Sequence, residues 1–248
     1  MQYKDLQKPL ISVVIPTIPS RKHLLKRALK SVNNQTYKNI EILTIDNIDS
    51  ATKARNRGVN NSKGQFIAFL DDDDEWIPTK LEKQMECMLQ HKHVPLVTCY
   101  TQDKRFGHDR INKPKKNASQ KDIIKAFNYS STSTYLARKS FLCGLFTFDI
   151  LLPSAQEYDL AIRLAEHENL LCVPEILVIQ HATKGQISEN WKRKIQGMIA
   201  IYQKHHEKYG FLEYIKFVGM LILFSCGFII GNNIYKIIIP VKKRHEGD

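Results

Sequence analysis

Four consecutive aspartates, Asp71 to Asp74, and the adjacent Glu75 form a dense acidic cluster in the sequence. They directly follow residues 66–70, an uninterrupted apolar run typical of a strand covered on both faces. Carboxylates gathered at a strand end repel one another unless a cation lies among them. Such oxygen-rich clusters suit Mg²⁺ or Mn²⁺, which use one or two carboxylates together with substrate phosphates. An acidic turn that is merely solvated is the alternative interpretation.

Two further apolar runs frame a helix and indicate how the acidic cluster is positioned. Residues 10–15 and 40–45 predict buried strands, which end at Pro16 and Asp46. The segment between them predicts a helix that Ser20 can cap, with its apolar residues on one stripe: Leu24, Leu25, Ala28, Leu29 and Val32. Strand, helix and strand with short joints form a βαβ unit. The pattern therefore predicts an α/β fold with a Rossmann-like, mostly parallel sheet flanked by helices.

The rest of the chain predicts further elements around this unit. Apolar runs indicate strands over residues 94–100, 133–137 and 176–180. Apolar periodicity and helix-start residues indicate helices over residues 78–89, 156–167 and 188–209. Residues 50–58 are a polar, basic segment that runs into the acidic strand, with only a short link between Asp46 and Ala54. Residues 102–121 are also polar and basic and predict a mobile loop.

Composition bounds the class of protein. The 248 residues, 43% of them apolar, suit one large globular domain or one domain with an appendage. The five cysteines are scattered without a C-x-x-C pair, as expected of reduced thiols rather than of a disulfide framework or a zinc site. The polar first nine residues predict no signal peptide.

The net charge of +12 indicates an anionic partner. Nucleic acid, an anionic membrane surface and a phosphorylated substrate are the three candidates. Nucleic acid is the least favoured, because the sequence has no zinc-finger spacing, no RNP aromatic motif and no helix that concentrates basic residues. We therefore expect a phosphorylated substrate or a membrane surface as the partner, and no nucleic acid.

The C-terminal part of the chain predicts contact with a membrane. Residues 217–235 carry no charge, and this run is close to the ~20 residues that cross a bilayer. Basic residues follow it: Lys236, Lys242, Lys243 and Arg244. We expect residues 186–248 to be a helical extension whose segment at about residues 217–235 associates with the cytoplasmic side of the inner membrane, peripherally or as a single anchor. A buried core helix is the alternative.

Five segments of the sequence resemble the family 2 glycosyltransferases, which have the GT-A fold. They lie between about residues 11 and 180 and read ISVVIPTIPSR, LLKRALKSVNNQTYKNIEIL, ARNRG, KGQFIAFLDDDDEW and QEYDLAIRLA. The resemblance implies a GT-A domain over residues 9–185 that takes a sugar from a nucleotide-sugar donor.

The resemblance implies a metal-binding pair in the acidic cluster. Asp71 and Asp73 would form the D-x-D motif that holds Mg²⁺ or Mn²⁺ against the donor diphosphate, with Asp72 on the donor side. His181 follows a predicted strand, near the place where family members carry a late polar residue close to the metal. It is a further candidate ligand, although a lone histidine after a strand is more often structural.

The resemblance also implies a set of donor-binding residues. Pro16, Thr17 and Asp46 would lie against the nucleoside at the carboxyl ends of the first two strands. Arg55 would contact the diphosphate, which a guanidinium can bind through two parallel hydrogen bonds. The chain departs from the family pattern after Asp46, where a further helix and strand are usual, and after Thr17, where the common Tyr-Asn is absent.

Glu157 is the candidate general base. It lies in the segment QEYDL, where the resemblance places an acidic residue, more usually Asp, that deprotonates the acceptor. A carboxylate at a helix start is also stabilised by the helix dipole, so a purely structural role is the alternative. We expect Asp159 to be structural, paired with a nearby backbone group or with Arg163.

These features predict a metal-dependent, inverting glycosyltransferase whose acceptor is a glycan or a lipid-linked precursor of surface polysaccharide or lipopolysaccharide. A nucleotidyltransferase would need a glycine-rich loop after the first strand, and a phosphatase would need an aspartate where Pro16 stands. A catalytically degenerate, membrane-bound scaffold of a polysaccharide assembly complex is the remaining alternative.

Overall fold

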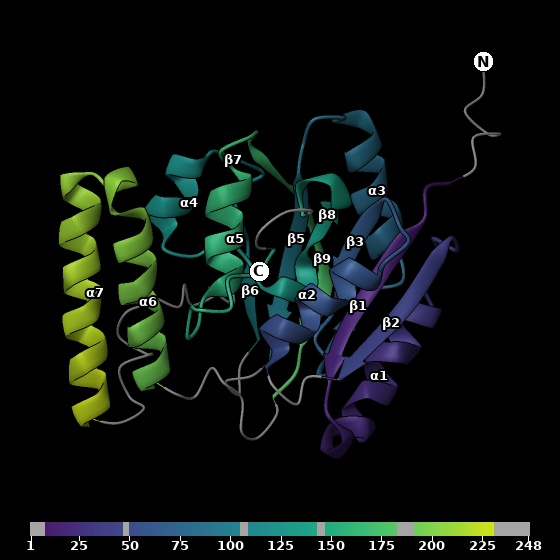
Figure 1. The fold of residues 1–248 in the computed structure, drawn as a ribbon, viewed down its shortest axis with the longest axis horizontal. Helices are drawn as coiled ribbons and strands as arrows, with labels where there is room; N and C mark the ends of the chain where they lie inside the picture. The colour runs from purple at the N-terminus through teal and green to yellow at the C-terminus, as the bar shows by residue number, and fades with distance from the viewer. Residues whose placement is uncertain (1–7, 47–49, 105–108, 143–146, 183–190, 231–248) are drawn as a thin grey trace, which may run out of the picture. The chain divides into compact units, whose positions relative to one another are not determined.

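The computed structural model describes residues 8–46, 50–104, 109–142, 147–182 and 191–230. These fall into two compact units. The first comprises residues 1–151 and 156–184, and the second comprises residues 152–155 and 185–248. The first unit carries the sheet, and the second carries two long helices that lie side by side (Figure 1).

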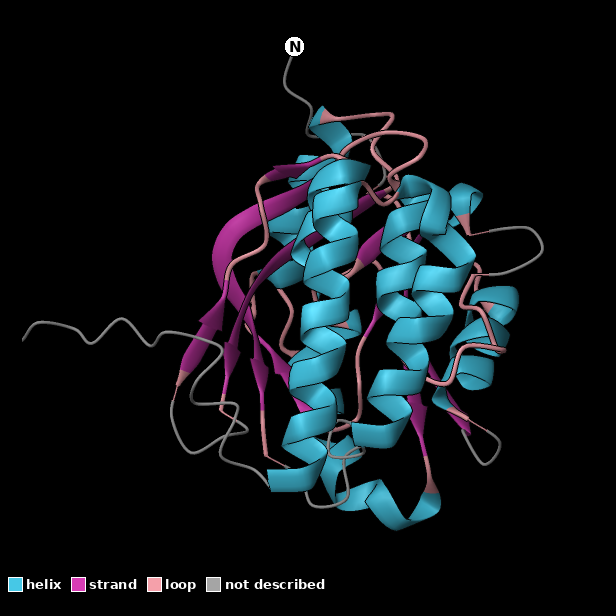
Figure 2. Ribbon diagram, turned by 90° about the vertical axis from the view of Figure 1, so that its left-hand side faces the viewer, coloured by secondary structure: helices cyan, strands magenta, loops and turns pink. Residues whose placement is uncertain are grey.

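The described strands of the first unit form one sheet, which is twisted (Figure 2). They are β1 (Ile11–Thr17), β2 (Ile40–Asp46), β3 (Phe66–Phe69), β4 (Asp74–Trp76), β5 (Leu96–Asp103), β6 (Arg110–Asn112), β7 (Asn117–Ala118), β8 (Leu136–Arg138) and β9 (Leu170–Gln180). Along the main path the order is β2-β1-β3-β8-β5-β9-β4. β1 pairs in parallel with β2 and β3, and β5 pairs in parallel with β9. The other pairings are antiparallel.

Helices of the first unit cover this sheet, as the sequence predicts. Those of the first unit are α1 (Lys22–Asn33), α2 (Ala51–Asn61), α3 (Lys80–Gln90), α4 (Gln120–Ala126) and α5 (Gln156–Leu164). The second unit has α6 (Trp191–His205) and α7 (Phe211–Ile230). Short 3₁₀ turns are η1 (Pro19–Arg21), η2 (Thr132–Thr134), η3 (Lys139–Phe141) and η5 (His206–Lys208). The predicted α/β class, with a βαβ unit at its start, is confirmed.

Strand β1 lies at the centre of the core because both of its faces are covered. Val13 and Ile15 pack in one apolar cluster with residues of α1 and α3, among them Val32 and Met85. The intervening Val14 faces α2, which approaches through Gly58. A strand buried on both faces requires apolar side chains at every position, which explains the continuous runs in the sequence.

Two polar segments are more ordered than the sequence indicates. Helix α2 begins at Ala51, inside the short link expected between Asp46 and Ala54, and Ser50 caps that helix by accepting a hydrogen bond from the Lys53 amide. The apolar stripe of α2 consists of small residues, so its periodicity is weak in the sequence. Residues 102–121 are not simply a loop, because they extend β5, form β6 and β7 and begin α4. β6 and β7 form because they pair with β5 and β9, and local composition does not indicate such pairing with distant strands.

Two predicted element boundaries also differ. Ser20 does not cap α1, because it lies inside η1 and α1 begins without a side-chain cap. β9 begins at Leu170 rather than residue 176, since its first half pairs with β5 and β7.

The tail is described as far as Ile230. Helix α7 starts at Phe211, six residues before the predicted uncharged segment, and residues 231–235 of that segment lie outside the described residues. Within the described part of the chain, no helix combines the length and the apolar character needed to cross a membrane.

The close approach of α2 to β1 gives a stability prediction. An added methyl group on Gly58 would lie 2.9 Å from Val14 Cγ2 and closer still to Val14 Cγ1. Gly58→Ala should therefore lower the free energy of unfolding by about 2 kcal/mol, as overpacking of a core does. Urea denaturation measures the change. The matched control is Gly219→Ala in α7, where an added methyl meets nothing within 4 Å. Equal stability of the two variants would show that α2 can move away from β1 without cost.

Candidate active site

The acidic cluster lies at the edge of the sheet where three parallel strands end. In the register of β1 and β2, Thr17 lies opposite Asp46, and the 71–73 turn follows β3 on the other side of β1. The Thr17 hydroxyl donates a 2.9 Å hydrogen bond to Asp72 Oδ2. The fold thus brings together residues from three separate segments that the sequence assigned to donor binding.

Arginines neutralise the carboxylates of the 71–73 turn. Arg21 lies 3.0 Å from Asp72 Oδ1 and 2.6 Å from Asp73 Oδ2. Arg55 from α2 forms an ion pair with Asp71. Arg27 from α1 donates a 2.5 Å hydrogen bond to the backbone carbonyl of Asp73. The repulsion expected among adjacent carboxylates is therefore offset by cations from η1 and α2, with α1 holding the turn itself.

Asp72 is the most enclosed carboxylate of the turn, with 1% of the residue exposed. Burial raises its pKa, while Arg21 and the Thr17 hydrogen bond act in the opposite direction. Because its two oxygens are held by Thr17 and Arg21, Asp72 fixes the shape of the turn. Asp71 and Asp73 are more exposed than Asp72 and can reach a ligand.

Asp74 and Glu75 are separate from the turn. Asp74 is buried in β4, where Oδ2 accepts hydrogen bonds from the Ser133 hydroxyl at 2.6 Å and from Gln180 at 3.4 Å. The Ser133 hydroxyl also accepts a 3.1 Å hydrogen bond from the Asp71 amide. Asp74 is therefore a support of the turn, and the acidic run divides into partly exposed residues (Asp71, Asp73 and Glu75) and buried structural ones (Asp72 and Asp74).

The residues present fit a divalent cation bound together with phosphate. Asp71 and Asp73 offer hard carboxylate oxygens, and Mg²⁺ commonly takes one or two carboxylates with substrate phosphates. His181 Nε2 lies 3.0 Å from Glu75 Oε2, and it follows Gln180, which pairs with Asp74. Over the described residues, no three His, Cys, Asp or Glu side chains converge to hold a metal unaided. Further ligands would have to come from the donor.

Glu157 lies near this turn although it is far away in the sequence. It is half-buried at the start of α5, and its backbone carbonyl accepts a 3.2 Å hydrogen bond from the Tyr135 hydroxyl. Burial raises the pKa of the Glu157 carboxyl, Arg55 opposes this rise, and Asp71 adds to it. The helix start is expected to favour the ionised form of the Glu157 carboxyl, but burial has the larger effect on its pKa. A raised pKa brings a carboxylate base closer to neutral pH.

The remaining predicted residues lie around the same edge of the sheet. Pro16 is buried within β1 rather than after it, and Asp46 is exposed at the end of β2, where its backbone carbonyl accepts a hydrogen bond from Arg57. The Asp46 carboxylate is thus accessible beside Thr17.

Sequence reasoning missed Phe148 and Asn56, which hold the predicted residue Arg55 in place. The Arg55 guanidinium lies 5.6 Å from the centre of the Phe148 ring. The Asn56 side chain fixes Phe148 by donating to its carbonyl at 2.8 Å and accepting from its amide at 2.9 Å. Arg21, which contacts Asp72 and Asp73, was missed as well. Its only local signal is that it is a basic residue shortly after the first strand. The partnership of Asn56 with Phe148 spans 92 positions and leaves no local pattern.

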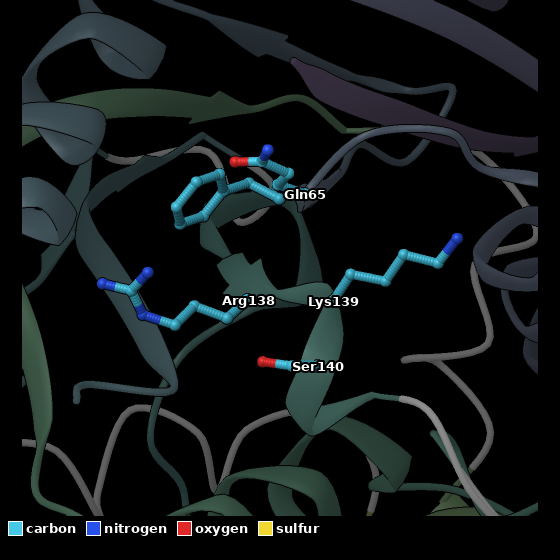
Figure 3. Close-up of a pocket in the computed structure, with 5 residues that line it drawn as sticks. Gln65, Arg138, Lys139 and Ser140 are labelled. Atoms are coloured by element: carbon cyan, nitrogen blue, oxygen red, sulfur yellow. The ribbon is translucent and has the colours of Figure 1, made fainter. Parts of the chain in front are cut away.

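A separate hollow of about 350 Å³ lies at the opposite end of β3 (Figure 3). It is lined by Gln65, Phe66, Arg138, Lys139 and Ser140. Arg138 is engaged there with backbone carbonyls at the end of α3, including that of Met88 at 2.7 Å. Lys139 likewise donates to the carbonyl of Ser62. These polar groups serve the packing of β8, so the hollow is not part of the candidate site.

Known proteins resemble this chain in sequence and in fold. Residues 50–145 match the model of Glycosyl transferase family 2. The putative colanic acid biosynthesis glycosyl transferase WcaA of Escherichia coli (strain K12) is 27% identical over 241 residues, which cover 81% of this chain and 83% of the relative. The chain is thus similar to the family 2 glycosyltransferases. It is therefore an enzyme of glycosyl transfer.

Two other similarities bear on this glycosyltransferase. The UDP-Glc:alpha-D-GlcNAc-diphosphoundecaprenol beta-1,3-glucosyltransferase WfgD of Escherichia coli is 33% identical over 107 residues, 33% of this chain and 42% of the relative. The mannosyltransferase PcManGT from Pyrobaculum calidifontis, solved with GDP-Man and Mn²⁺, superposes with a TM-score of 0.65 at 13% identity, over 91% of this chain and 77% of that one. The GT-A fold expected from the sequence is thereby confirmed.

Asp159 of this glycosyltransferase is structural, as predicted. It is fully buried, and Oδ2 lies 2.8 Å from Arg163 Nη2 and 2.9 Å from Nε. Arg163 also donates to the Thr147 carbonyl at 2.8 Å.

Asp159→Asn should lower the free energy of unfolding by about 2 kcal/mol, because it removes the charge of a fully buried carboxylate that is paired with a partly exposed arginine. Chemical denaturation measures this loss. Glu157→Gln on the same helix serves as the comparison, since it removes a charge that is only half-buried. If Asp159→Asn unfolds at the wild-type denaturant concentration, Arg163 does not depend on Asp159 for its position.

Proposed function

We propose that the protein is a metal-dependent, inverting glycosyltransferase that uses a nucleotide-sugar donor. The observation that supports this most strongly is the ion pair between Arg55 and Asp71 at the carboxyl end of β3. The charges of both residues also act on the carboxyl group of Glu157, the candidate base. We further propose that residues 9–185 are the catalytic domain and that residues 186–248 are a helical extension.

In the proposed reaction the acceptor hydroxyl attacks the anomeric carbon from the face opposite the diphosphate. Glu157 accepts the hydroxyl proton as the new carbon–oxygen bond forms and the bond to the diphosphate breaks. A single displacement of this kind inverts the anomeric configuration. The half-buried position of Glu157 keeps its carboxyl poorly hydrated, which strengthens it as a base.

The proposed donor site follows the end of the sheet. Thr17 and Asp46 face the nucleoside, Pro16 supports Thr17 from within β1, and Arg55 pairs with the diphosphate. Asp72 shapes the turn through its contact with Thr17.

The proposed cation is Mg²⁺ or Mn²⁺, and PcManGT was solved with Mn²⁺ and a nucleotide sugar. Asp71 and Asp73 would hold it, and His181 is a further candidate ligand from the end of β9. When bound, the cation would offset the negative charge on the leaving diphosphate.

We propose a glycan or lipid-linked acceptor at the cytoplasmic face of the membrane. WfgD, by its name, acts on a diphosphoundecaprenol-linked sugar. Helix α7 supports the membrane part of the proposal. Phe217 is buried and stacks on Tyr202 of α6, with ring centres 4.6 Å apart. Phe211, Ile215 and Ile222 lie on another face of the helix and are 77%, 50% and 57% exposed.

One prediction of the proposed function tests Glu157 as the general base. Glu157→Gln keeps the size of the side chain but removes the proton acceptor, so sugar transfer should fall by about 10²–10⁴ while donor binding survives. For the wild type, kcat/KM should decline on the acid side around a pKa above 4.5, the ordinary value for Glu. Transfer is measured as release of nucleoside diphosphate, and product NMR gives the anomeric configuration.

The pH dependence of stability provides the control for this variant. A carboxyl whose pKa is raised by folding stabilises the protein at low pH and loses that contribution as pH rises through its folded pKa. Glu157→Gln should remove this dependence of the free energy of unfolding on pH. Near-normal transfer by Glu157→Gln, or a product with retained configuration, would contradict the proposed role.

The second prediction tests the membrane surface. Replacing Phe211, Ile215 and Ile222 together by serine should weaken binding to phosphatidylglycerol vesicles by at least about tenfold, because burial of such side chains contributes about 1.5–3 kcal/mol each. Co-sedimentation measures the binding, and added salt should weaken it for the wild type. Leu89→Ser, at a position 54% exposed on α3, is the matched control. Equal binding by the triple variant and the wild type would exclude this face.

The alternative of a degenerate scaffold makes a different prediction. A scaffold would release no nucleoside diphosphate from any nucleotide sugar in the presence of Mn²⁺. The assembled set of Arg55, Asp71 and Glu157 favours the enzyme.

A further inference from the structure

Arg21 bridges two neighbouring carboxylates of the 71–73 turn. Nη1 lies 3.0 Å from Asp72 Oδ1, and Nη2 lies 2.6 Å from Asp73 Oδ2. Arg21 precedes Asp73 by 52 positions, so the fold and not the local sequence makes this contact. Neither the sequence motifs nor the proposed mechanism gives Arg21 a role.

The side chains of the two carboxylates differ in how exposed they are. Both oxygens of Asp72 are engaged, one by Thr17 and one by Arg21, and its side chain is 2% exposed. The side chains of Asp73 and Arg21 are 13% and 30% exposed. The Asp73 end of the bridge is therefore the part that can open toward solvent.

We infer that Arg21 is an internal counter-ion that occupies Asp73 until a divalent cation and the donor diphosphate arrive together. The inference rests on the proposed function. A divalent cation on Asp73 would lie close to the guanidinium that contacts the same carboxylate, and like charges at that separation repel each other. Arg21 must leave Asp73 before the cation can bind there.

The diphosphate makes this exchange favourable. It offers Arg21 another anion, which a guanidinium can bind through two hydrogen bonds. The cation alone therefore binds weakly, and the cation with a nucleoside diphosphate binds tightly. This is a positive coupling between the two ligands, and it must act equally in both directions. Arg21 thus determines how strongly metal binding depends on the donor.

The test is a titration with Mn²⁺ alone, without nucleotide, in which electron paramagnetic resonance measures free Mn²⁺. Arg21→Gln should bind Mn²⁺ at least about tenfold more tightly than the wild type, the factor that corresponds to one hydrogen bond to a charged group. Arg21→Lys, which keeps the charge but cannot bridge both carboxylates, should fall between the two. Lys22→Gln, the same charge change at the exposed neighbouring residue, should match the wild type.

Equal or weaker Mn²⁺ binding by a folded Arg21→Gln would overturn the inference. Where circular dichroism shows that Arg21→Gln does not fold, Arg21→Lys decides, and wild-type affinity in that variant overturns it. Failure of the proposed function is distinguishable from failure of the counter-ion role of Arg21. Tighter Mn²⁺ binding in a protein that transfers no sugar refutes the function alone, and unchanged Mn²⁺ binding in an active enzyme refutes the counter-ion role alone.

Discussion

Repulsion among the carboxylates that follow β3 is the constraint on which the site depends. Asp71, Asp72 and Asp73 lie in one short turn at the end of a fully buried strand, where water cannot screen them well. Arg21 and Arg55 offset this repulsion by forming ion pairs with the three carboxylates. The charges of this turn are therefore offset by the protein itself, and the proposed diphosphate and cation would have to exchange partners with these arginines.

The sheet supplies the precision that this balance requires. The parallel pairing of β1 with β2 and β3 brings Thr17, Asp46 and the 71–73 turn to one edge. Antiparallel β4 and the η2 turn then hold the 71–73 turn in place, through Asp74 and Ser133. These two elements therefore support the candidate site, and the parallel strands carry the residues assigned to ligand binding.

The sequence predicted those parts of the site that depend on local pattern. Apolar runs located β1, β2 and β3, and the residues that follow them belong to the site because parallel strands end at a common edge. The same approach failed for α2, whose buried stripe is made of small residues, and for β6 and β7, which depend on pairing with distant strands. Glu157 could be assigned only by resemblance, and the partners Phe148 and Ser133 gave no local signal.

The central claim is that the turn after β3 binds a nucleotide sugar through a divalent cation. Thermal unfolding in the presence of a panel of nucleotide sugars, with Mn²⁺ or with EDTA, tests it most directly. A donor at 100 times its dissociation constant adds about 2.7 kcal/mol of stability. The account predicts that at least one nucleotide sugar raises Tm by several degrees with Mn²⁺, and that EDTA or Asp73→Asn removes the rise. Stabilisation that persists both in EDTA and in Asp73→Asn, or none by any nucleotide sugar, would contradict it.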